Sequence, residues 1–328
     1  MKHISILVPT GAHLGCIDGT LQVLTEVNTY LASKGRPAAF TIQLTGLSKE
    51  TALKNGLFTV YPDVLISELK KTDLIIIPAP FHLDFNKTIE MNRDILPWIV
   101  SQYKSGAEVA SLCVGAFLLA ASGLLKGLKC STHWMFANDF RNMFPDVELV
   151  TDKIITDEKG LYTSGGALSY MNLILYLVEK MAGREVAVHC SKVFGIDIDR
   201  NSQSHFIMFR GQKTHEDESV KKAQEYIEKH FQDKITVDQL ASLVSIGRRN
   251  LERRFKKATS NTVVEYMQRV KIEAAKLSFE SSRENVNEVM YKVGYTDTKA
   301  FRTTFKKITG LSPIHYRNKY NRELAVYD

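Results

Sequence analysis

The chain has 328 residues, of which 44% are hydrophobic and 24% charged, and its formal net charge is +7. These ordinary globular values exclude disordered, collagen-like and low-complexity fibrous proteins. At about 150 residues per domain, the length predicts two domains. The four cysteines are widely spaced and form no CxxC pair, which excludes a disulfide scaffold or a zinc ribbon and fits a reducing cytosol.

The net charge is confined to the last third of the chain. Residues 1–212 contain 20 basic and 20 acidic side chains, whereas residues 213–328 contain 23 basic and 16 acidic ones. Such segregation indicates that the two parts meet different partners, and the basic part fits a polyanion. The alternative is a basic surface that is simply solvated.

No segment predicts export or membrane insertion. The N-terminal MKHISILVPTG is too short an apolar run for a signal peptide and is typical of a first strand. The longest apolar run, 109–125, is interrupted by Gly115 and Gly123, so it does not predict a membrane span. We therefore expect a cytoplasmic protein that does not bind membranes.

Short apolar runs alternate with helical patterns over the first 180 residues. The run DLIIIP at 73–78 is typical of a strand buried on both faces. Alternating strands and helices favour a parallel sheet covered on both sides. In chain order, we predict strands at 3–8, 39–44, 73–78, 109–112, 148–150 and 161–163, and helices at 18–33, 89–103, from about 115, and at 167–181.

From about residue 214 the pattern changes to consecutive helices separated by short turns. The stretch before it is polar, with DIDRNSQSH and GQKTHEDE, and is typical of a domain end and a linker. We therefore predict an α/β domain at 1–195, a linker at 196–218 and an all-α domain at 219–320.

The basic third contains an internal repeat. RNLERRFKKATSNTVVEYM at 249–267 aligns with KAFRTTFKKITGLSPIHYR at 299–317 at a constant offset of 50. Upstream, LASLVSI aligns with VMYKVGY. Each copy predicts a short helix, a turn centred on Ser245 or Gly294, and a second helix, which is the layout of a helix-turn-helix. Gly294 suits a turn that needs a positive φ.

The second helix of each copy is the predicted DNA-reading element. Apolar residues four apart, such as Phe301 and Phe305, would face the core and leave polar side chains free to contact base edges and phosphates. The alternative is a pair of helical hairpins with solvated basic side chains. The predicted DNA-binding residues are Arg248, Arg249, Asn250, Glu252, Arg253, Lys256, Thr298, Lys299, Arg302, Thr303 and Lys306.

Residues 220–320 resemble an AraC-type DNA-binding domain, which holds two helix-turn-helix units in one chain. The family's closing pattern, G-F-x5-F-x3-F-K-x3-G-x-[ST]-P-x2-[YF]-R, is present through Arg317, with Tyr295 in place of its Phe. The resemblance implies sequence-specific binding to promoter DNA. Gly247 and Arg248 stand where the first unit usually has Ser-Pro, and Thr303 stands where the second usually has Arg. The arginine-rich first unit is therefore expected to carry more of the base readout.

A cysteine marks a second candidate site in the first domain. SLCVGA at 111–116 joins an apolar strand to a helix, and its small residues fit a sharp strand–turn–helix elbow around Cys113. At a helix N-terminus, the helix dipole predicts a lowered pKa for the Cys113 thiol. The alternative is that Cys113 is a small buried hydrophobic residue.

Three more residues are expected near this elbow. Pro80 follows the central strand at the edge of the sheet where open α/β folds bind ligands. Asp18 opens the first predicted helix, and His133 lies in the segment STHW. In the simpler interpretation, Asp18 is a helix N-cap and His133 a structural histidine. The candidate pocket consists of Asp18, Pro80, Cys113, Val114 and His133.

Residues 1–190 resemble the class I glutamine amidotransferase-like fold, a flavodoxin-like parallel sheet, in its PfpI-type branch. ASLCVGAFLLAASGLLKGLKCSTHW is similar to the stretch found where this domain precedes AraC-type units, as in GlxA-like regulators. Isonitrile hydratase of the same fold uses an Asp, a Cys and the following Thr. Asp18 and Cys113 match, whereas Val114 replaces that Thr, and also replaces the His that PfpI-type proteases carry. The resemblance therefore implies a ligand-sensing or dimerising domain rather than an enzyme.

The leading interpretation is a transcription regulator that binds double-stranded promoter DNA, with a small-molecule effector and a homodimer formed through the N-terminal domain. The first alternative is a Cys-dependent hydratase or amidohydrolase that uses Cys113 and Asp18. The second is a thiol-based redox switch at Cys113. The sequence contains no metal-ligand cluster, P-loop or GxGxxG fingerprint, so we predict no metal and no cofactor.

Overall fold

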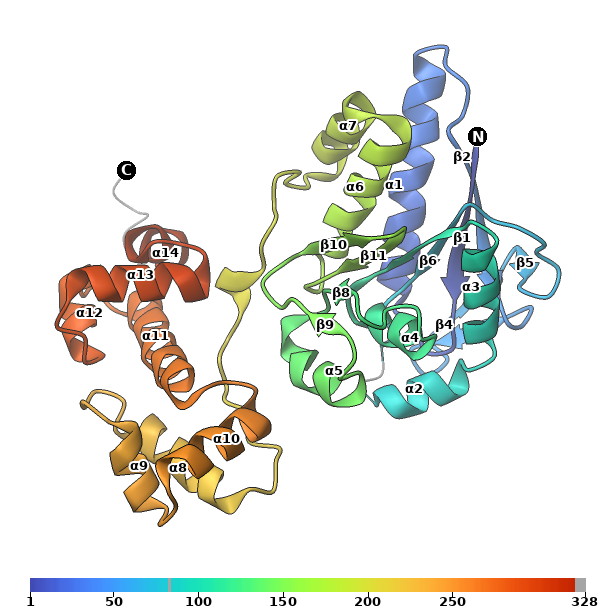
Figure 1. Cartoon of the computed structure of the whole chain (residues 1–328). Coiled ribbons are helices and arrows are strands. Elements are labelled where there is room, and N and C mark those ends of the chain that lie inside the picture. The colour runs from blue at the N-terminus through green and yellow to red at the C-terminus, as the bar shows by residue number, and fades with distance from the viewer. Residues whose placement is uncertain (82–83, 322–328) are drawn as a thin grey trace. The chain divides into compact units, whose positions relative to one another are not determined.

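The structure is a computed structural model that describes residues 1–81 and 84–321 (Figure 1). The chain divides into two compact units, residues 1–203 and 204–328. This division falls inside the predicted linker 196–218, whose residues through Gln203 belong to the first unit and whose remaining residues belong to the second. In the described part of the chain, no helix combines the length and the apolar character needed to cross a membrane.

The first unit is built on one seven-stranded sheet. Its strands are β1 (Lys2–Val8), β2 (Phe40–Gly46), β5 (Val64–Leu65), β6 (Leu74–Ile77), β7 (Glu108–Ser111), β10 (Ile155–Glu158) and β11 (Leu161–Ser164). Their order is β10-β11-β7-β6-β1-β2-β5, and all neighbours pair in parallel except β10 and β11. Two smaller sheets pair β3 (Thr51–Leu53) with β4 (Phe58–Val60) and β8 (Lys129–Cys130) with β9 (Glu148–Leu149). This mostly parallel sheet confirms the predicted flavodoxin-like α/β class.

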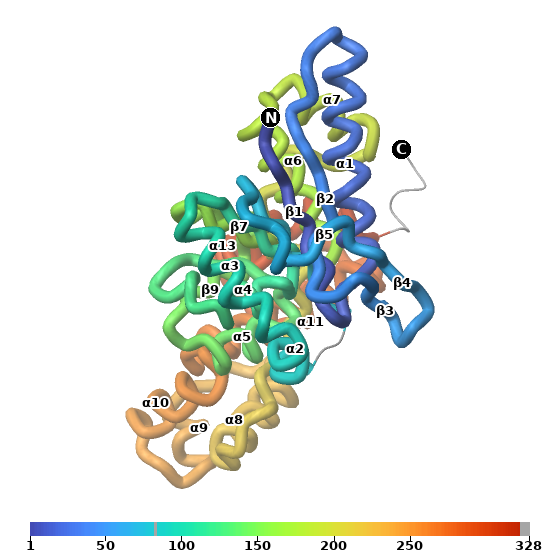
Figure 2. The backbone as a smooth tube through the Cα atoms, turned by 90° about the vertical axis from the view of Figure 1, so that its right-hand side faces the viewer, coloured from blue at the N-terminus to red at the C-terminus, as the bar shows by residue number. Residues whose placement is uncertain are grey.

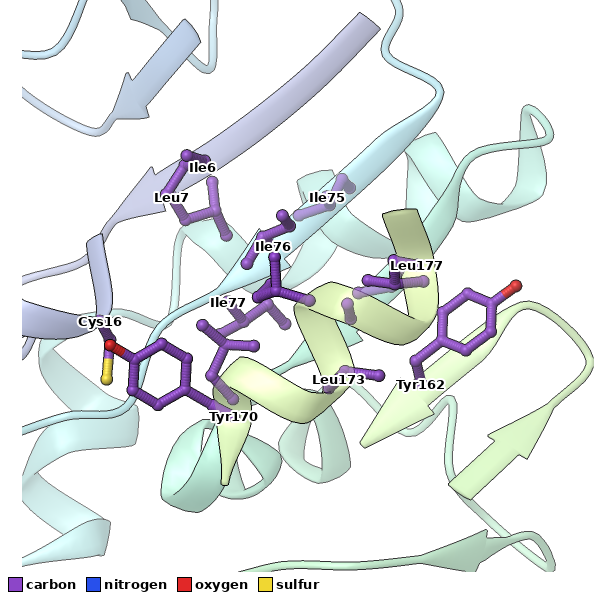
Figure 3. Close-up of a cluster of buried hydrophobic side chains, with 14 of the residues drawn as sticks. Ile6, Leu7, Cys16, Ile75, Ile76, Ile77, Tyr162, Tyr170, Leu173 and Leu177 are labelled. Carbon is purple, nitrogen blue, oxygen red and sulfur yellow. The ribbon is translucent and has the colours of Figure 1, made fainter. Parts of the chain in front are cut away.

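Helices cover both faces of this sheet (Figures 1 and 2). One face of the sheet carries α1 (Leu14–Ser33), α6 (Tyr170–Ala182) and α7 (Arg184–Phe194). The other face carries α2 (Phe85–Met91), α3 (Ile95–Lys104) and α4 (Ala116–Ala121). Helix α5 (Ala137–Met143) packs against α4 through Phe140 and Phe117. Ile75, Ile76 and Ile77 of β6 are fully buried, and Leu173 and Leu177 of α6 lie over the sheet (Figure 3). The central strand is therefore apolar on both faces, as predicted.

Two helix predictions need correction. The helix predicted at 18–33 begins at Leu14 and its N-cap is His13, so Asp18 lies inside α1 and is not an N-cap. The helix predicted at 89–103 is split into α2 and α3 at Asn92. The buried Asn92 side chain bonds the backbone of Thr10 and Thr88, and these bonds hold the break in place. The short strands β3, β4, β5, β8 and β10 were not predicted.

In residues 204–321, the described part of the second unit, all regular structure is helical. Its helices are α8 (Glu218–Lys229), α9 (Val237–Leu243), α10 (Arg248–Thr259), α11 (Val263–Ser281), α12 (Val286–Lys292), α13 (Thr298–Thr309) and α14 (Pro313–Tyr320). Three begin with a capping box, in which the N-cap side chain and the third helical residue bond each other's backbone, at Thr236, Thr262 and Asn285. These reciprocal bonds satisfy the backbone N–H groups that a helix start leaves free, and they fix where α9, α11 and α12 begin.

The long helix α11 joins two small cores (Figure 1). Its N-terminal half contributes Val263 and Tyr266 to a core with α8, α9 and α10, where Phe255 is fully buried. Its C-terminal half contributes Ile272 and Phe279 to a core with α12, α13 and α14. The second unit is therefore two helix-turn-helix cores on one shared helix.

Candidate DNA interface and cysteine elbow

The two helix-turn-helix turns have the same backbone conformation. Ser245, between α9 and α10, has φ 55°, and Gly294, between α12 and α13, has φ 75°. Both therefore occupy the left-handed region, as the turn predicted at Gly294 requires.

In α10, the fully buried Leu251 and Phe255 leave the opposite face exposed to solvent. On this face, an Arg253 NH2 group donates to Asn250 Oδ1 at 3.0 Å. Arg248 is held from two sides, by Asp238 Oδ2 at 3.0 Å and by Glu252 Oε1 at 3.3 Å. The exposed residues of the predicted set are Arg248, Arg249, Asn250, Arg253 and Lys256, whereas Glu252 is half-buried.

Helix α13 of the C-terminal helix-turn-helix unit has the same arrangement, with a buried apolar face and an exposed polar face, but with different exposed side chains. The N-cap Asp297 accepts a hydrogen bond from the Ala300 N–H, and Phe301 and Phe305 are fully buried. The exposed residues are Thr298, Lys299, Arg302, Thr303 and Lys306. The structure thus places all the predicted residues of both second helices except Glu252 on exposed surface.

Sequence reasoning missed the residue that anchors α10. Arg254 donates to both oxygens of Asp217 at 2.7 and 2.6 Å, and Asp217 is the N-cap of α8. Hydrogen bonding to Arg254 lowers the pKa of Asp217. The adjacent arginines at 253–254 were the available sequence signal, because neighbouring residues on a helix point in different directions. In the structure Arg253 is exposed and Arg254 is half-buried.

The segment before α8 is also bound to this unit. Lys276 of α11 is 3% exposed, and its Nζ donates to Ile207 O at 2.6 Å and to Glu273 Oε2 at 2.8 Å. The same carboxylate accepts the Phe209 N–H at 3.0 Å. A buried ion pair on α11 therefore holds residues 207–209 against the helix.

The elbow in the first unit is as sharp as its small residues predict. Cys113 has φ 55° and begins the short 3-10 helix η1 (Cys113–Gly115), directly after β7 and before α4. A Cβ on Gly115 would lie 2.7 Å from Ile77 O and 2.9 Å from Pro78 O. Only glycine allows this approach to the end of β6.

The Cys113 thiol does not behave as predicted. Cys113 is buried, and this burial raises the pKa of the thiol to about 12. The predicted lowering by the helix dipole is wrong, because η1 and α4 are short and desolvation dominates. The thiol is therefore protonated at neutral pH.

The other predicted pocket residues differ in exposure and in hydrogen-bond partners. Asp18 is exposed and accepts from Gln22 Nε2 at 2.7 Å. His133 Nδ1 accepts the Met135 N–H, and burial lowers the pKa of His133. Pro80 and Val114 are buried. Within residues 1–81 and 84–321, no hydrogen bond joins Asp18 or His133 to Cys113.

Two residues that were not predicted, Ser164 and Thr132, bond the backbone of Cys113, although Ser164 directly follows the strand predicted at 161–163 and Thr132 lies in the segment STHW. The Cys113 N–H donates to Ser164 Oγ at 3.0 Å, and its carbonyl accepts from Thr132 Oγ1 at 3.1 Å. Cys16 points toward Tyr170, whose hydroxyl donates to Gly15 O (Figure 3). Ser164, at the end of β11, begins the small-residue run SGG, which was the available signal.

A buried glutamine continues the hydrogen bonds from the elbow to the end of the first unit. Gln203 is fully buried, and its Nε2 donates to Thr132 O at 3.1 Å and to Lys153 O at 3.2 Å. Gly165 provides the space, because a Cβ there would overlap Gln203. Thr132 therefore contacts both Cys113 and the last residue of the unit. No group of three or more His, Cys, Asp or Glu in the described residues could hold a metal ion.

Comparison with known proteins agrees with this division. Residues 21–180 match the DJ-1/PfpI family, and residues 240–319 match a helix-turn-helix domain. The HTH-type transcriptional regulators GbdR and CdhR of Pseudomonas aeruginosa are each 24% identical; GbdR aligns over 83% of this chain and 72% of its own, CdhR over 80% and 77%. A crystal structure of a candidate transcriptional regulator from Vibrio parahaemolyticus covers 58% of this chain and 98% of its own, with 21% identity and a TM-score of 0.52, which supports the fold.

The chain is therefore a DNA-binding transcription regulator, with an α/β domain followed by a helix-turn-helix domain. More specifically, it combines a DJ-1/PfpI domain, of the class I glutamine amidotransferase-like fold, with an AraC-type pair of helix-turn-helix units.

Proposed function

We propose that this regulator reads promoter DNA with the exposed faces of α10 and α13, and that its DJ-1/PfpI domain senses a small-molecule effector. The DNA-binding part rests on the basic faces of α10 and α13. These faces are exposed because Phe255 and Phe305 are buried on the opposite side of each helix. Lys and Arg on such faces bind phosphates, and the polar residues near each helix start contact bases.

The sensing part rests on one observation, the hydrogen-bonded series Cys113, Thr132 and Gln203. Gln203 is the last residue of the first unit, and the next segment is pinned to α11 by Lys276. A ligand that shifts the elbow would move Thr132 and Gln203, and so pull on the start of the segment attached to the DNA-binding unit.

The same geometry supports a domain without catalytic activity. A nucleophilic cysteine needs a thiolate, whereas burial keeps the Cys113 thiol protonated. The residue after it is Val114, which has no proton to donate or accept. A hydratase or amidohydrolase mechanism through Cys113 and Asp18 is therefore not favoured.

The proposal includes the compartment and assembly expected from the sequence. A regulator that binds promoters acts in the cytoplasm of a bacterium, where the DNA is accessible. A homodimer formed through the N-terminal domain would place four helix-turn-helix units on one promoter.

Gln203→Ala and Cys113→Ala in the full chain test this function. Operators are first identified by genome-wide mapping of bound DNA, and effectors by thermal-shift screening of a metabolite library. We expect Cys113→Ala to bind its operator normally without effector, because Cys113 lies in the first unit, whereas α10 and α13 belong to the second. Gln203→Ala should still show the thermal shift with the effector, while the effector no longer changes operator affinity.

Three results would contradict this proposal. The first is a folded Cys113→Ala protein that does not bind the operator. The second is a Gln203→Ala protein whose operator affinity still responds fully to the effector. The third is a library in which every compound that stabilises the protein leaves operator affinity unchanged.

A further inference from the structure

The two helix-turn-helix units touch through a loop as well as through α11. Residues 230–236 connect α8 to α9 within the N-terminal helix-turn-helix unit, yet Phe231 packs against the core of the C-terminal helix-turn-helix unit, which contains Phe279 and Phe301. This loop is therefore a second connection between the two helix-turn-helix units, in addition to the shared helix.

The next residue of the loop, Gln232, contacts the turn of the C-terminal helix-turn-helix unit through its backbone. A Cβ on Gly294 would overlap the carbonyl oxygen of Gln232. Gly294 also has φ 75°, so glycine is required at this position both for its conformation and for the close approach.

A lysine on α11 bonds both sides of this contact. Lys271 Nζ donates to Gly294 O at 3.2 Å and to Asp233 O at 3.4 Å. Its ammonium also lies 5.6 Å from the centre of the Tyr295 ring. The Lys271 side chain is half-buried. Its ammonium thus links the shared helix α11, the loop of the N-terminal helix-turn-helix unit and the turn of the C-terminal one.

A cleft of about 450 Å³ borders this joint, lined on one side by Asp233 to Ile235 and on the other by Tyr295 to Asp297, with α11 beneath. Side chains do not fill the space between the loop and the start of α13. Besides the shared helix α11, the contacts of Phe231, Gln232, Lys271 and Gly294 hold the two helix-turn-helix units in their relative orientation at this cleft.

We propose that Lys271 is a positioning residue that fixes the separation of the two DNA-reading helices, so that the protein discriminates between operators by the spacing of their half-sites. The inference rests on the proposed DNA-reading faces of α10 and α13. A turn of B-DNA takes about 10 base pairs, so one inserted base pair rotates one half-site by about 36° and shifts it by about 3.4 Å. A rigid joint resists this change, whereas a loosened joint accommodates it.

The test compares Lys271→Met with the unchanged full-length protein on three duplexes. The operator is selected from random duplexes, and its half-sites are assigned with Arg253→Ala and Arg302→Ala; the other two duplexes have one base pair inserted or removed between the half-sites. We expect the unchanged protein to lose at least about tenfold in affinity on the altered duplexes, since tenfold corresponds to about 1.4 kcal/mol. Lys271→Met should lose less than about threefold on the same duplexes.

Two further variants complete the design. Lys222→Met removes an exposed lysine of α8, so it controls for the lost positive charge and should keep the spacing preference. Lys271→Arg should also keep it, because a guanidinium can donate to both carbonyls. If Lys271→Met does not fold, Lys271→Gln replaces it, since its shorter side chain cannot bond both carbonyls.

A folded Lys271→Met or Lys271→Gln protein that discriminates spacing as strongly as the unchanged protein would overturn the role of Lys271. Failure to select any duplex, or half-sites unaffected by Arg253→Ala and Arg302→Ala, would instead overturn the proposed DNA-reading faces, and the joint would then have nothing to position.

Discussion

Replacing Arg253 with alanine is expected to weaken operator binding by about 1–3 kcal/mol and to relax the base preference at one operator position. Arg253 is exposed on α10 and bonded to Asn250, which orients its guanidinium. An arginine can bond both acceptors of a guanine, and an asparagine can bond an adenine in the same way. Thr303 of α13 is shorter and offers one hydroxyl, so Thr303→Ala should cost less.

Binding of both variants to operators with single base changes measures this difference. The control is Lys256→Ala, which removes an exposed charge farther along α10 and should weaken all sequences about equally. Uniform weakening by Arg253→Ala, together with altered base preference in Thr303→Ala, would show that the second unit reads more of the sequence. Arg302, which is exposed beside Thr303, would be the residue to examine in that case.

Lys276→Met is expected to lower the free energy of unfolding of the DNA-binding unit by about 3–5 kcal/mol, because removing one partner of a buried ion pair leaves the other charge uncompensated. The carboxylate left behind is Glu273, whose side chain is 19% exposed. Ile207 O would also lose its donor, which weakens the attachment of the segment 207–209 to α11. The double variant Glu273→Gln with Lys276→Met should recover much of the loss, since it buries no unpaired charge.

Hydrogen exchange of the α11 amides in the full-length protein measures this effect. Lys292→Met is the matched control, because Lys292 pairs with Glu284 on the surface at 3.0 Å. Exposed pairs of this kind contribute about 0–1 kcal/mol. Similar loss of protection in Lys276→Met and Lys292→Met would contradict the account of the buried pair.

The parts of the fold that were predicted correctly are those written in local patterns. The run DLIIIP predicted a central strand, and the 50-residue repeat predicted both helix-turn-helix units and their turns at Ser245 and Gly294. Short strands such as β5 have two residues and depend on their neighbours in the sheet, so no periodicity could indicate them.

The candidate sites were predicted less evenly. The exposed faces of α10 and α13 follow from helical spacing, and they remain a predicted DNA surface. The cysteine elbow was located correctly, but the pKa of Cys113 depends on burial, which the sequence around it does not specify. The start of the first helix was predicted at Asp18 and not at Leu14, because α1 begins without a side-chain cap to mark its start. Contacts of Gln203 and Lys271 join segments far apart in the chain, so only the tertiary structure reveals them.

The measurement that tests the central claim most directly is a titration of the full-length protein with its selected duplex at several salt concentrations, for the unchanged protein and for Lys306→Gln. If α10 and α13 bind DNA, affinity falls steeply with salt, because each phosphate contact releases counterions. Lys306 is exposed on α13, and Lys306→Gln should reduce the slope by about 1 without changing base preference. Absence of binding at low salt, or a slope that no substitution on α10 or α13 alters, would contradict the assignment of these helices as the DNA-binding surface.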